Sequence, residues 1–256
     1  MEFFSLTDIG LVRKKNQDSY ITVYNENHDL LVLVCDGIGG HKAGEVASSE
    51  IVKYFGEVFS SHKGFRDDED VITYLKYHVR VASNIVYKMS LENSEYEGMG
   101  TTITGILISS IGSYVVNAGD SRVYGYGNHE LHQLTKDHTY VNELIDRCII
   151  TPEQAKTHPK RHYLTRFLGV YEDASCDAYK VSGFNEYYLV CSDGLHGYVP
   201  YEFIKKTIED RNMSLISKTT TLLKKAISEG GYDNITLVLI NMTGGNKHEW
   251  KTVIIK

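Results

Sequence analysis

The stretch from Leu31 to Phe55, LVLVCDGIGGHKAGEVASSEIVKYF, decides the fold because its character changes twice within 25 residues. The apolar run Leu30–Cys35 predicts a buried β-strand. An acid and three glycines follow, and the apolar residues between Ala47 and Phe59 then recur at helical spacing. A strand, an acidic residue, a glycine-rich turn and a helix in this order indicate a functional site at the turn.

Two phosphate-binding loops can be tested directly against this turn. A dinucleotide-binding fingerprint requires glycine where Lys42 stands, and a P-loop requires lysine where Glu45 stands, so both are excluded. We therefore expect the glycines to let the backbone turn sharply, so that a carbonyl group and the Asp36 carboxylate face the same point.

The composition limits the classes of protein to consider. The 256 residues suffice for one large domain or two small ones, and 42% hydrophobic with 23% charged residues is typical of a soluble globular protein. Three prolines exclude a proline-rich linker. The formal net charge of −6 disfavours nucleic-acid binding, whereas acids held close together would attract metal cations.

The chain carries no pattern typical of export or of a membrane span. The beginning, MEFFSLTDIG, lacks the basic flank and long apolar core of a signal peptide, and no segment approaches the ~20 apolar residues of a span. None of the four cysteines forms a C-x-x-C pair, and Cys35 and Cys191 end apolar runs, which predicts core positions. We expect a reduced, cytoplasmic protein.

Strands are predicted in runs and helices in pairs. Residues 101–134 should form successive antiparallel strands, with a tight turn at Gly127-Asn128. Thr151 should start a helix, because T-P-E-Q offers an N-cap, a proline and a glutamine reaching back. This pattern favours antiparallel sheets covered by helices. The strands are expected at Leu30–Cys35, Thr101–Ser109, Ser113–Ala118, Ser121–Tyr126, Glu186–Cys191 and Ile235–Asn241, and the helices at 47–59, 75–89, from Thr151 and at Ser214–Glu229.

Five aspartates stand at predicted strand ends or turns: Asp18, Asp36, Asp120, Asp193 and Asp233. Any one of them alone would more often be a turn residue. Together they predict a carboxylate cluster on sheet edges, whose mutual repulsion a bound cation would offset. Because the cluster contains no Cys or His ligand, it favours Mg²⁺ or Mn²⁺ over Zn²⁺.

Seven segments occur along the chain in one order: VCDGIGGHKAGE, MGTT, NAGDSRVY, LTKDH, LTRFLG, CSDGL and GGYDNITLV. With them the chain, from Gly10 to about Asn241, resembles the metal-dependent Ser/Thr protein phosphatases of the PP2C (PPM) type in their bacterial form. The resemblance implies an α+β fold in which two antiparallel sheets form a β-sandwich flanked by helix pairs, in α-β-β-α layers. Residues 1–243 would form a single domain with a flap at about 137–169. The tail 244–256 would add an edge strand at Thr252–Ile255 or fray.

The resemblance also implies metal ligands. Asp36 would bridge two Mn²⁺ or Mg²⁺ ions, and the Gly37 carbonyl would help to hold one of them. Asp193 and Asp233 would bind the other ion. Asp120 would hold a third, looser ion together with Asp193, and Asp18 would act through metal-bound water.

The chemistry expected of such a site is phosphoester hydrolysis. Two ions that share a water molecule lower its pKa, and the resulting hydroxide would attack phosphorus in line. Arg13 would grip the phosphate, because its planar fork suits two phosphate oxygens; without the resemblance it would be a solvated residue of RKK. Arg13, Asp36 and Asp193 are therefore the expected catalytic residues.

Several positions depart from the family pattern or leave a role open. Eukaryotic relatives have histidine, and bacterial ones usually methionine, where Ile38 stands. The acid that protonates the leaving group could be His41 or metal-bound water. Cys148 replaces a usual glycine in the flap, and His196 to Tyr198 have no role that the sequence reveals. The threonines of MGTT are expected to be sheet residues beside the site.

Three functions remain distinguishable. The first is an active phosphatase of phosphoserine and phosphothreonine in proteins. The second is a catalytically silent phosphoprotein-binding or scaffold protein, which should have lost an acid at 36, 193 or 233; all three are present. The third is a phosphatase of small phosphoesters. The expected partners are phosphorylated proteins and a cognate Ser/Thr kinase, with no nucleic acid and no membrane, and the chain should be a monomer.

Overall fold

The computed structural model describes residues 1–38 and 43–243, which form two antiparallel sheets packed face to face. All strand pairs within them are antiparallel. The first sheet has the order β1 (Glu2–Asp8), β11 (Ile235–Asn241), β10 (Tyr187–Cys191), β7 (Arg122–Gly127) and β8 (Glu130–Gln133). The second has the order β2 (Asp18–Tyr24), β3 (Leu30–Ile38), β5 (Ile103–Ser109), β6 (Gly112–Ala118) and β9 (Asp177–Lys180), with β4 (Gly100–Thr101) paired to β3.

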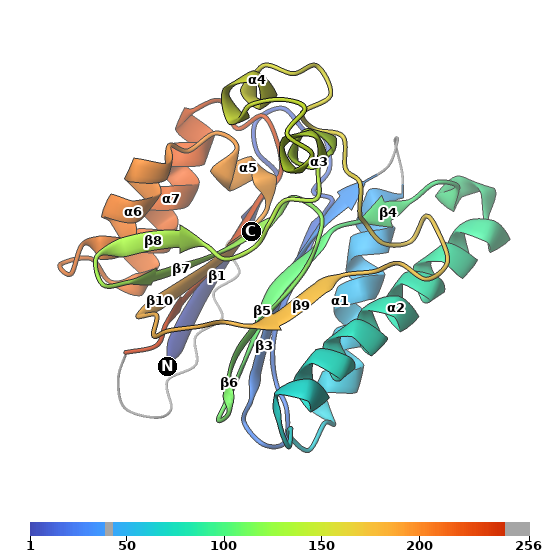
Figure 1. Cartoon of the computed structure of the whole chain (residues 1–256), viewed down its shortest axis with the longest axis horizontal. Helices are drawn as coiled ribbons and strands as arrows, with labels where there is room; N and C mark the ends of the chain where they lie inside the picture. Colours follow the sequence, from blue (N-terminus) through green and yellow to red (C-terminus); the bar gives the residue numbers. More distant parts are fainter. Residues whose placement is uncertain (39–42, 244–256) are drawn as a thin grey trace.

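Helices cover both outer faces of this sandwich (Figure 1). The pair α1 (Gly44–Ser60) and α2 (Asp68–Glu92) packs on the second sheet. The pair α6 (Tyr201–Glu209) and α7 (Leu215–Ser228) packs on the first. The predicted α-β-β-α layers are thus confirmed. The shorter helices are η1 (Ser94–Tyr96), α3 (Tyr140–Asp146), α4 (Pro152–Lys156) and α5 (Asp193–His196).

The strand β3 shows how the opening stretch specifies this layering. Its residues from Leu30 to Cys35 are all fully buried. Leu31, Leu33 and Cys35 pack against α1 and α2, whereas the alternate residues pack between the two sheets. Because successive side chains of a strand point to opposite faces, a strand buried on both faces must be apolar throughout. Cys35 and Cys191 are core residues, as predicted.

Two details of the predicted strand pairing were wrong. The strands β6 and β7 do not pair with each other, because the chain crosses from the second sheet to the first between them. Gly119 makes this crossing possible: its φ is +133°, and a Cβ there would lie 2.5 Å from Thr102 Cγ2. The hairpin between β7 and β8 turns at Asn128-His129, not Gly127-Asn128, because Asn128 and His129 carry positive φ angles of 52° and 63°.

The predicted helices from Thr151 and at Ser214–Glu229 are confirmed, whereas α1 and α2 begin earlier than predicted, at Gly44 and Asp68. Thr151 and Gln154 form the predicted capping box at the start of α4. The strand β11 has the predicted bounds, and α7 begins and ends one residue inside the predicted range. Residues 39–42 and 244–256 lie outside the described part, and with them the predictions about His41 and about the tail. No helix of the described residues is long and apolar enough to cross a membrane.

Candidate active site

The antiparallel registers bring the predicted acids to one end of the sandwich. In an antiparallel pair, the end of one strand lies beside the start of its neighbour. The last residues of β1, β3 and β10 therefore lie beside the first residues of β11, β2 and β7, respectively. The acids stand within two residues of these positions, although they are far apart in the chain.

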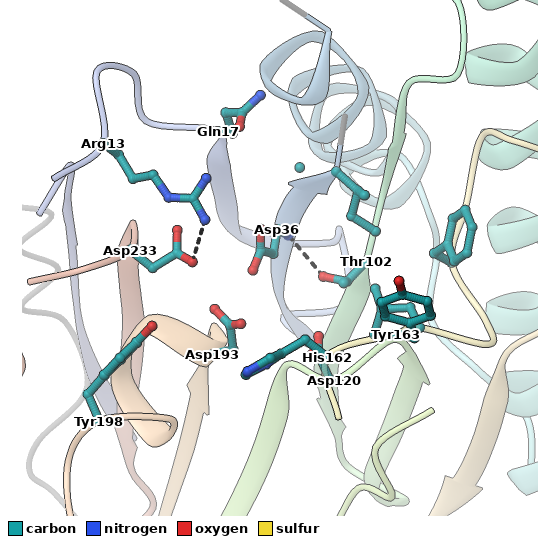
Figure 2. Close-up of a pocket in the computed structure, with 14 residues that line it drawn as sticks. Arg13, Gln17, Asp36, Thr102, Asp120, His162, Tyr163, Asp193, Tyr198 and Asp233 are labelled. Atoms are coloured by element: carbon teal, nitrogen blue, oxygen red, sulfur yellow. Dashed lines mark hydrogen bonds and ion pairs between the residues drawn. The ribbon is translucent and has the colours of Figure 1, made fainter. Parts of the chain in front are cut away.

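A cavity of about 550 Å³ opens at this end. Six of the seven predicted site residues line it: Arg13, Asp36, Gly37, Asp120, Asp193 and Asp233. Figure 2 shows the carboxylates pointing toward one another from strands and loops of both sheets. The seventh, Asp18, does not line the cavity; it lies opposite Asp36 in the pairing of β2 with β3, with 8% of its surface exposed.

The backbone of Asp36 is held on both sides by the threonines of MGTT. The Asp36 N–H donates to Thr102 Oγ1 at 2.9 Å, and the Asp36 carbonyl accepts from the Thr102 N–H at 2.8 Å and from Thr101 Oγ1 at 2.9 Å. Both threonines are buried. These bonds agree with the expectation that the two threonines are sheet residues beside the site. They fix the Asp36 backbone, and with it the position from which the carboxylate extends.

The buried Asp18 links the two sheets beneath the cavity. Ser192 directly precedes Asp193, and its Oγ donates to Asp18 Oδ2 at 2.7 Å. Paired residues of adjacent antiparallel strands present their side chains on the same face. Asp18 therefore supports Asp36 from below, and its bond to Ser192 joins β2 of the second sheet to the end of β10 in the first.

Two glycines of the opening stretch, Gly37 and Gly44, serve close packing. A Cβ on Gly37 would lie 2.3 Å from the Gly44 carbonyl oxygen and 2.6 Å from that of Gln17, and one on Gly44 would lie 2.7 Å from Gln17 Nε2. The φ angle of Gly37 is not positive, so the expected sharp turn is not its reason. Gly37 is required because the end of β3 and the start of α1 cross in contact.

The turn that carries Asp120 is fixed by a histidine for which the sequence offered no role. His196 Nε2–H donates to the Asp120 carbonyl at 2.9 Å. Burial lowers the pKa of His196 to about 3, so the ring is neutral and has one N–H to give. Because His196 ends α5 and Asp193 begins it, this bond holds Asp120 and Asp193 in one arrangement.

The loop that carries Arg13 is attached to the loop that carries Asp233. Arg13 Nη2 donates to Asp233 Oδ2 at 2.7 Å, which raises the pKa of Arg13. The buried Asn234 donates from Nδ2 to the carbonyls of Ile9 and Lys15, at 3.0 and 2.9 Å, and its Oδ1 accepts from the Gln17 N–H at 2.8 Å. Asn234 was not among the predicted site residues; it positions Arg13 beside the acids.

Four of the acids hold protons more tightly than free carboxyls do. Burial, with the charges of neighbouring acids, raises the pKa of Asp18 and of Asp120 to about 7 and that of Asp193 to about 6. The pKa of Asp36 is raised well above its ordinary value for the same reasons, with Asp18 and Asp193 as the largest charges after burial. The acids thus oppose one another's ionisation.

The donor set fits hard divalent cations. Asp18 Oδ1 and Asp193 Oδ1 are buried and have no hydrogen-bond partner among the described residues. Unpaired, mutually repelling carboxylate oxygens at one point are the ligands that Mg²⁺ and Mn²⁺ prefer. In residues 1–38 and 43–243 no three His, Cys, Asp or Glu side chains are already closed into a metal-binding group.

The opposite wall of the cavity comes from the predicted flap. Four residues of this segment line the cavity: His162, Tyr163, Leu164 and Phe167. Figure 1 shows α3 and α4 above the same end of the sandwich. A second cavity of about 480 Å³, which extends beneath these helices, shares Asp120, His162, Asp193 and Tyr198 with the first. No pattern in the sequence pointed to His162, because only the fold brings it to the acids.

Comparison with known proteins decides the family. Residues 12–229 match the family model described as Protein phosphatase 2C. The chain belongs to the protein phosphatase 2C family. The serine/threonine phosphatase stp of Listeria monocytogenes serotype 4b is 33% identical over 235 residues, which cover 91% of this chain and 93% of that protein. The seven ordered motifs were therefore sufficient to predict the family from the sequence.

Solved structures of this family share the fold. The crystal structure of the serine/threonine phosphatase Stp1 from Staphylococcus aureus has a TM-score of 0.89 and 33% identity, and covers 95% of this chain and 96% of that one. The catalytic domain of the serine threonine protein phosphatase PstP, in complex with 2 manganese ions, has a TM-score of 0.78 and 32% identity. That match covers 93% of this chain and 96% of the other.

Proposed function

We propose that this member of the protein phosphatase 2C family hydrolyses phosphoserine and phosphothreonine in proteins, with Mn²⁺ or Mg²⁺ held by the acids at the end of the sandwich. The chain is a protein serine/threonine phosphatase by its family and its relatives. The observation that carries the proposal for the site is the cavity that joins four carboxylates to one arginine.

The residues divide into those that would hold the ions and those that position them. When bound, two divalent ions supply charge for the phosphate oxygens and lower the pKa of water between them. Asp36 and the Gly37 carbonyl, with Asp193 and Asp233, would hold these two ions. Asp120 would hold a third with Asp193. Asp18, beneath the floor, would orient water rather than touch an ion.

Arg13 would bind the phosphate group of the substrate. Its side chain is half exposed and its guanidinium lies 2.7 Å from Asp233, so a phosphate on Arg13 would lie directly against the acids. A guanidinium stays protonated at every working pH, and its fork offers two parallel donors to two phosphate oxygens. The attachment of its loop through Asn234 keeps that fork at the rim of the cavity.

The proton for the departing serine or threonine oxygen would come from His41 or from water in the site. We also propose phosphorylated proteins as partners, a Ser/Thr kinase as the opposing enzyme, a cytoplasmic location and a monomeric state. The supporting observation for the monomer is that one chain alone supplies all the acids and the arginine.

A matched set of variants tests this function. Phosphopeptides that carry phosphoserine, phosphothreonine or phosphotyrosine are incubated with Mn²⁺ or with excess chelator, and released phosphate is measured. We expect hydrolysis of the first two only with the metal, and a loss of at least about 100-fold in Asp36→Asn. Asp173→Asn is the control, because Asp173 is exposed and its φ of +56° suits asparagine equally well.

The alternatives predict other outcomes. Activity that persists in chelator and in Asp36→Asn would contradict a metal-dependent reaction at this site. Hydrolysis of small phosphoesters with none of phosphopeptides would favour the small-molecule function. Binding of phosphopeptides without any phosphate release would favour the silent, phosphoprotein-binding function.

A further inference from the structure

Three large side chains with apolar faces are exposed beside the cavity. Leu11 is 69% exposed, Tyr232 54% and Tyr198 38%. The rings of Tyr198 and Tyr232 lie with their centroids 5.5 Å apart, and the Leu11 N–H donates to the carbonyl of Gly231, the neighbour of Tyr232, at 2.7 Å. Leu11 thus lies against Gly231, the neighbour of Tyr232, and we call Leu11, Tyr198 and Tyr232 together the apolar rim.

The backbone beneath the apolar rim is closely fitted. Gly10, with a φ of +76°, lies so close to the other loop that a Cβ would stand 2.3 Å from the Asp233 carbonyl oxygen. Gly231 also has a positive φ, and a Cβ on it would lie 3.0 Å from Leu11 Cγ. Together with the bonds of Asn234, these contacts hold both loops in one conformation. A fixed surface can select among ligands, because little ordering is left to the moment of binding.

The apolar rim adjoins the groups proposed to hold the phosphate. Tyr232 directly precedes Asp233, and Leu11 stands two residues before Arg13. Tyr198 itself lines the cavity. Figure 2 shows Tyr198, Arg13 and Asp233 on one side of the cavity, with Tyr163 on the other. Any peptide whose phosphoresidue enters the cavity on this side must pass over or beside the rim.

We propose that the apolar rim binds a large apolar side chain of the phosphoprotein substrate, located within about three residues of the phosphoserine or phosphothreonine. An extended peptide advances about 3.3 Å per residue, so the third residue lies about 10 Å from the phosphoresidue. Single exposed apolar residues are ordinary, but a fixed cluster continuous with a binding cavity indicates a contact surface. Tyrosine is also among the residues that contribute most at protein interfaces. This inference rests on the proposed function and specifies its substrate.

A peptide scan measures the preference directly. Leucine is placed at each position from three before to three after a phosphothreonine in a polyalanine-based peptide, and kcat/KM is compared with that of the parent peptide in Mn²⁺. We expect a gain of about tenfold at one position. In Tyr232→Ala and in Leu11→Ala, the kcat/KM of the leucine peptide divided by that of the parent peptide should fall to about one. Tyr232→Phe should keep the gain, and so should the control Tyr77→Ala, which removes a tyrosine 52% exposed on α2.

The outcomes separate this inference from the function on which it rests. Equal rates for all peptides in the wild type, or a gain that survives both rim substitutions, would overturn the inference and leave the phosphatase function standing. A gain lost in Tyr163→Ala but kept in Tyr232→Ala would assign the preference to the flap wall instead. No hydrolysis of any phosphopeptide would overturn the proposed function and the inference together. If Leu11→Ala fails to fold, the pair Tyr232→Ala and Tyr232→Phe decides.

Discussion

At the scale of single residues, the departure at Cys148 has a structural explanation. Cys148 follows Arg147, the C-cap of α3; it is exposed, has a φ of +55°, and its N–H donates to the Ile145 carbonyl at 2.8 Å. The next N–H, of Ile149, donates to the Leu144 carbonyl at 2.8 Å. This is the left-handed helix ending that glycine adopts without strain. The glycine expected at this position therefore suits the positive φ that the helix ending requires. The cysteine adopts the same φ, but its side chain makes that conformation strained.

We expect Cys148→Gly to stabilise the protein, by about 1 kcal/mol, because glycine removes the strain of a side chain in the left-handed region. Urea unfolding at fixed Mn²⁺ measures the difference. Cys148→Ala is the matched control: it also removes the thiol but keeps a Cβ, so it should not stabilise. Equal free energies of unfolding for the two variants would show that the thiol, not the backbone, matters at this position.

Other site residues act through contacts that no local pattern contains. Four of the five acids were predictable because each stands in a short motif, VCDGIGG, NAGDSR, CSDGL or GGYDN. The bonds from Asn234 to the Arg13 loop and from His196 to Asp120 were not, because their partners are more than 70 positions away in the chain. The role of a polar side chain that bonds a distant backbone becomes visible only when the registers of the strands are known.

At the scale of elements, the sequence predicted the strands and helices with long apolar patterns and the helix that starts with the capping box of Thr151. The strands β3 and β11 and the helices α1, α2 and α7 carry long apolar patterns. The strands β1 and β9 were missed: β9 has four residues of which only Ala178 is buried, and β1 is edged by acids and buries three consecutive residues. Its consecutive burial hides the alternation that predicts a strand, because β1 faces both a helix layer and the second sheet. The short helices α3 and α6 were also missed.

The interface between α1 and α2 contains a histidine held neutral. Burial, with the nearby charge of His62, lowers the pKa of His78 to about 4. Tyr54 Oη lies 2.7 Å from its Nδ1, and the Tyr74 ring centroid is 4.2 Å from that of His78. An unfolded histidine has a pKa near 6.5, so between these values the unfolded chain binds the proton and the folded chain does not. The stabilising contribution is present above about pH 6.5 and is lost as the pH falls toward 4.

We therefore expect His78→Phe to flatten the loss of stability between pH 6.5 and pH 4.5, by less than about 2 kcal/mol because the ring is only partly buried. Urea unfolding across this range gives the free energy of unfolding of each variant, and the difference from wild type isolates His78 from the titration of the acids. His132→Phe, at an exposed histidine, is the control and should keep the wild-type slope. Parallel slopes for wild type and His78→Phe would contradict the role of this ring.

At the scale of the whole molecule, the acids come from both halves of the sandwich. Asp18 and Asp36 belong to the second sheet, Asp193 and Asp233 follow and precede strands of the first, and Asp120 lies on the crossing between the sheets. Cations held by Asp36, Asp120, Asp193 and Asp233 would join the two sheets at an end where these acids repel one another. The same carboxylates that we propose to serve the reaction therefore oppose folding when no cation is present, which is the usual conflict between activity and stability.

This conflict predicts opposite effects of one substitution on stability. Without metal, Asp36→Asn should unfold at a higher urea concentration than wild type, with a gain of about 1 kcal/mol or more, because Asp36 is buried and faces the charges of Asp18, Asp120, Asp193 and Asp233. With Mn²⁺ at about 100 times its dissociation constant, wild type should gain about 2.7 kcal/mol and Asp36→Asn far less. Urea unfolding with chelator and with Mn²⁺ measures both differences, and Asp173→Asn should follow wild type in each. If Asp36→Asn has a lower free energy of unfolding than wild type without metal, Asp36 stabilises the fold by its own contacts. If Mn²⁺ stabilises Asp36→Asn as much as wild type, the cations bind elsewhere.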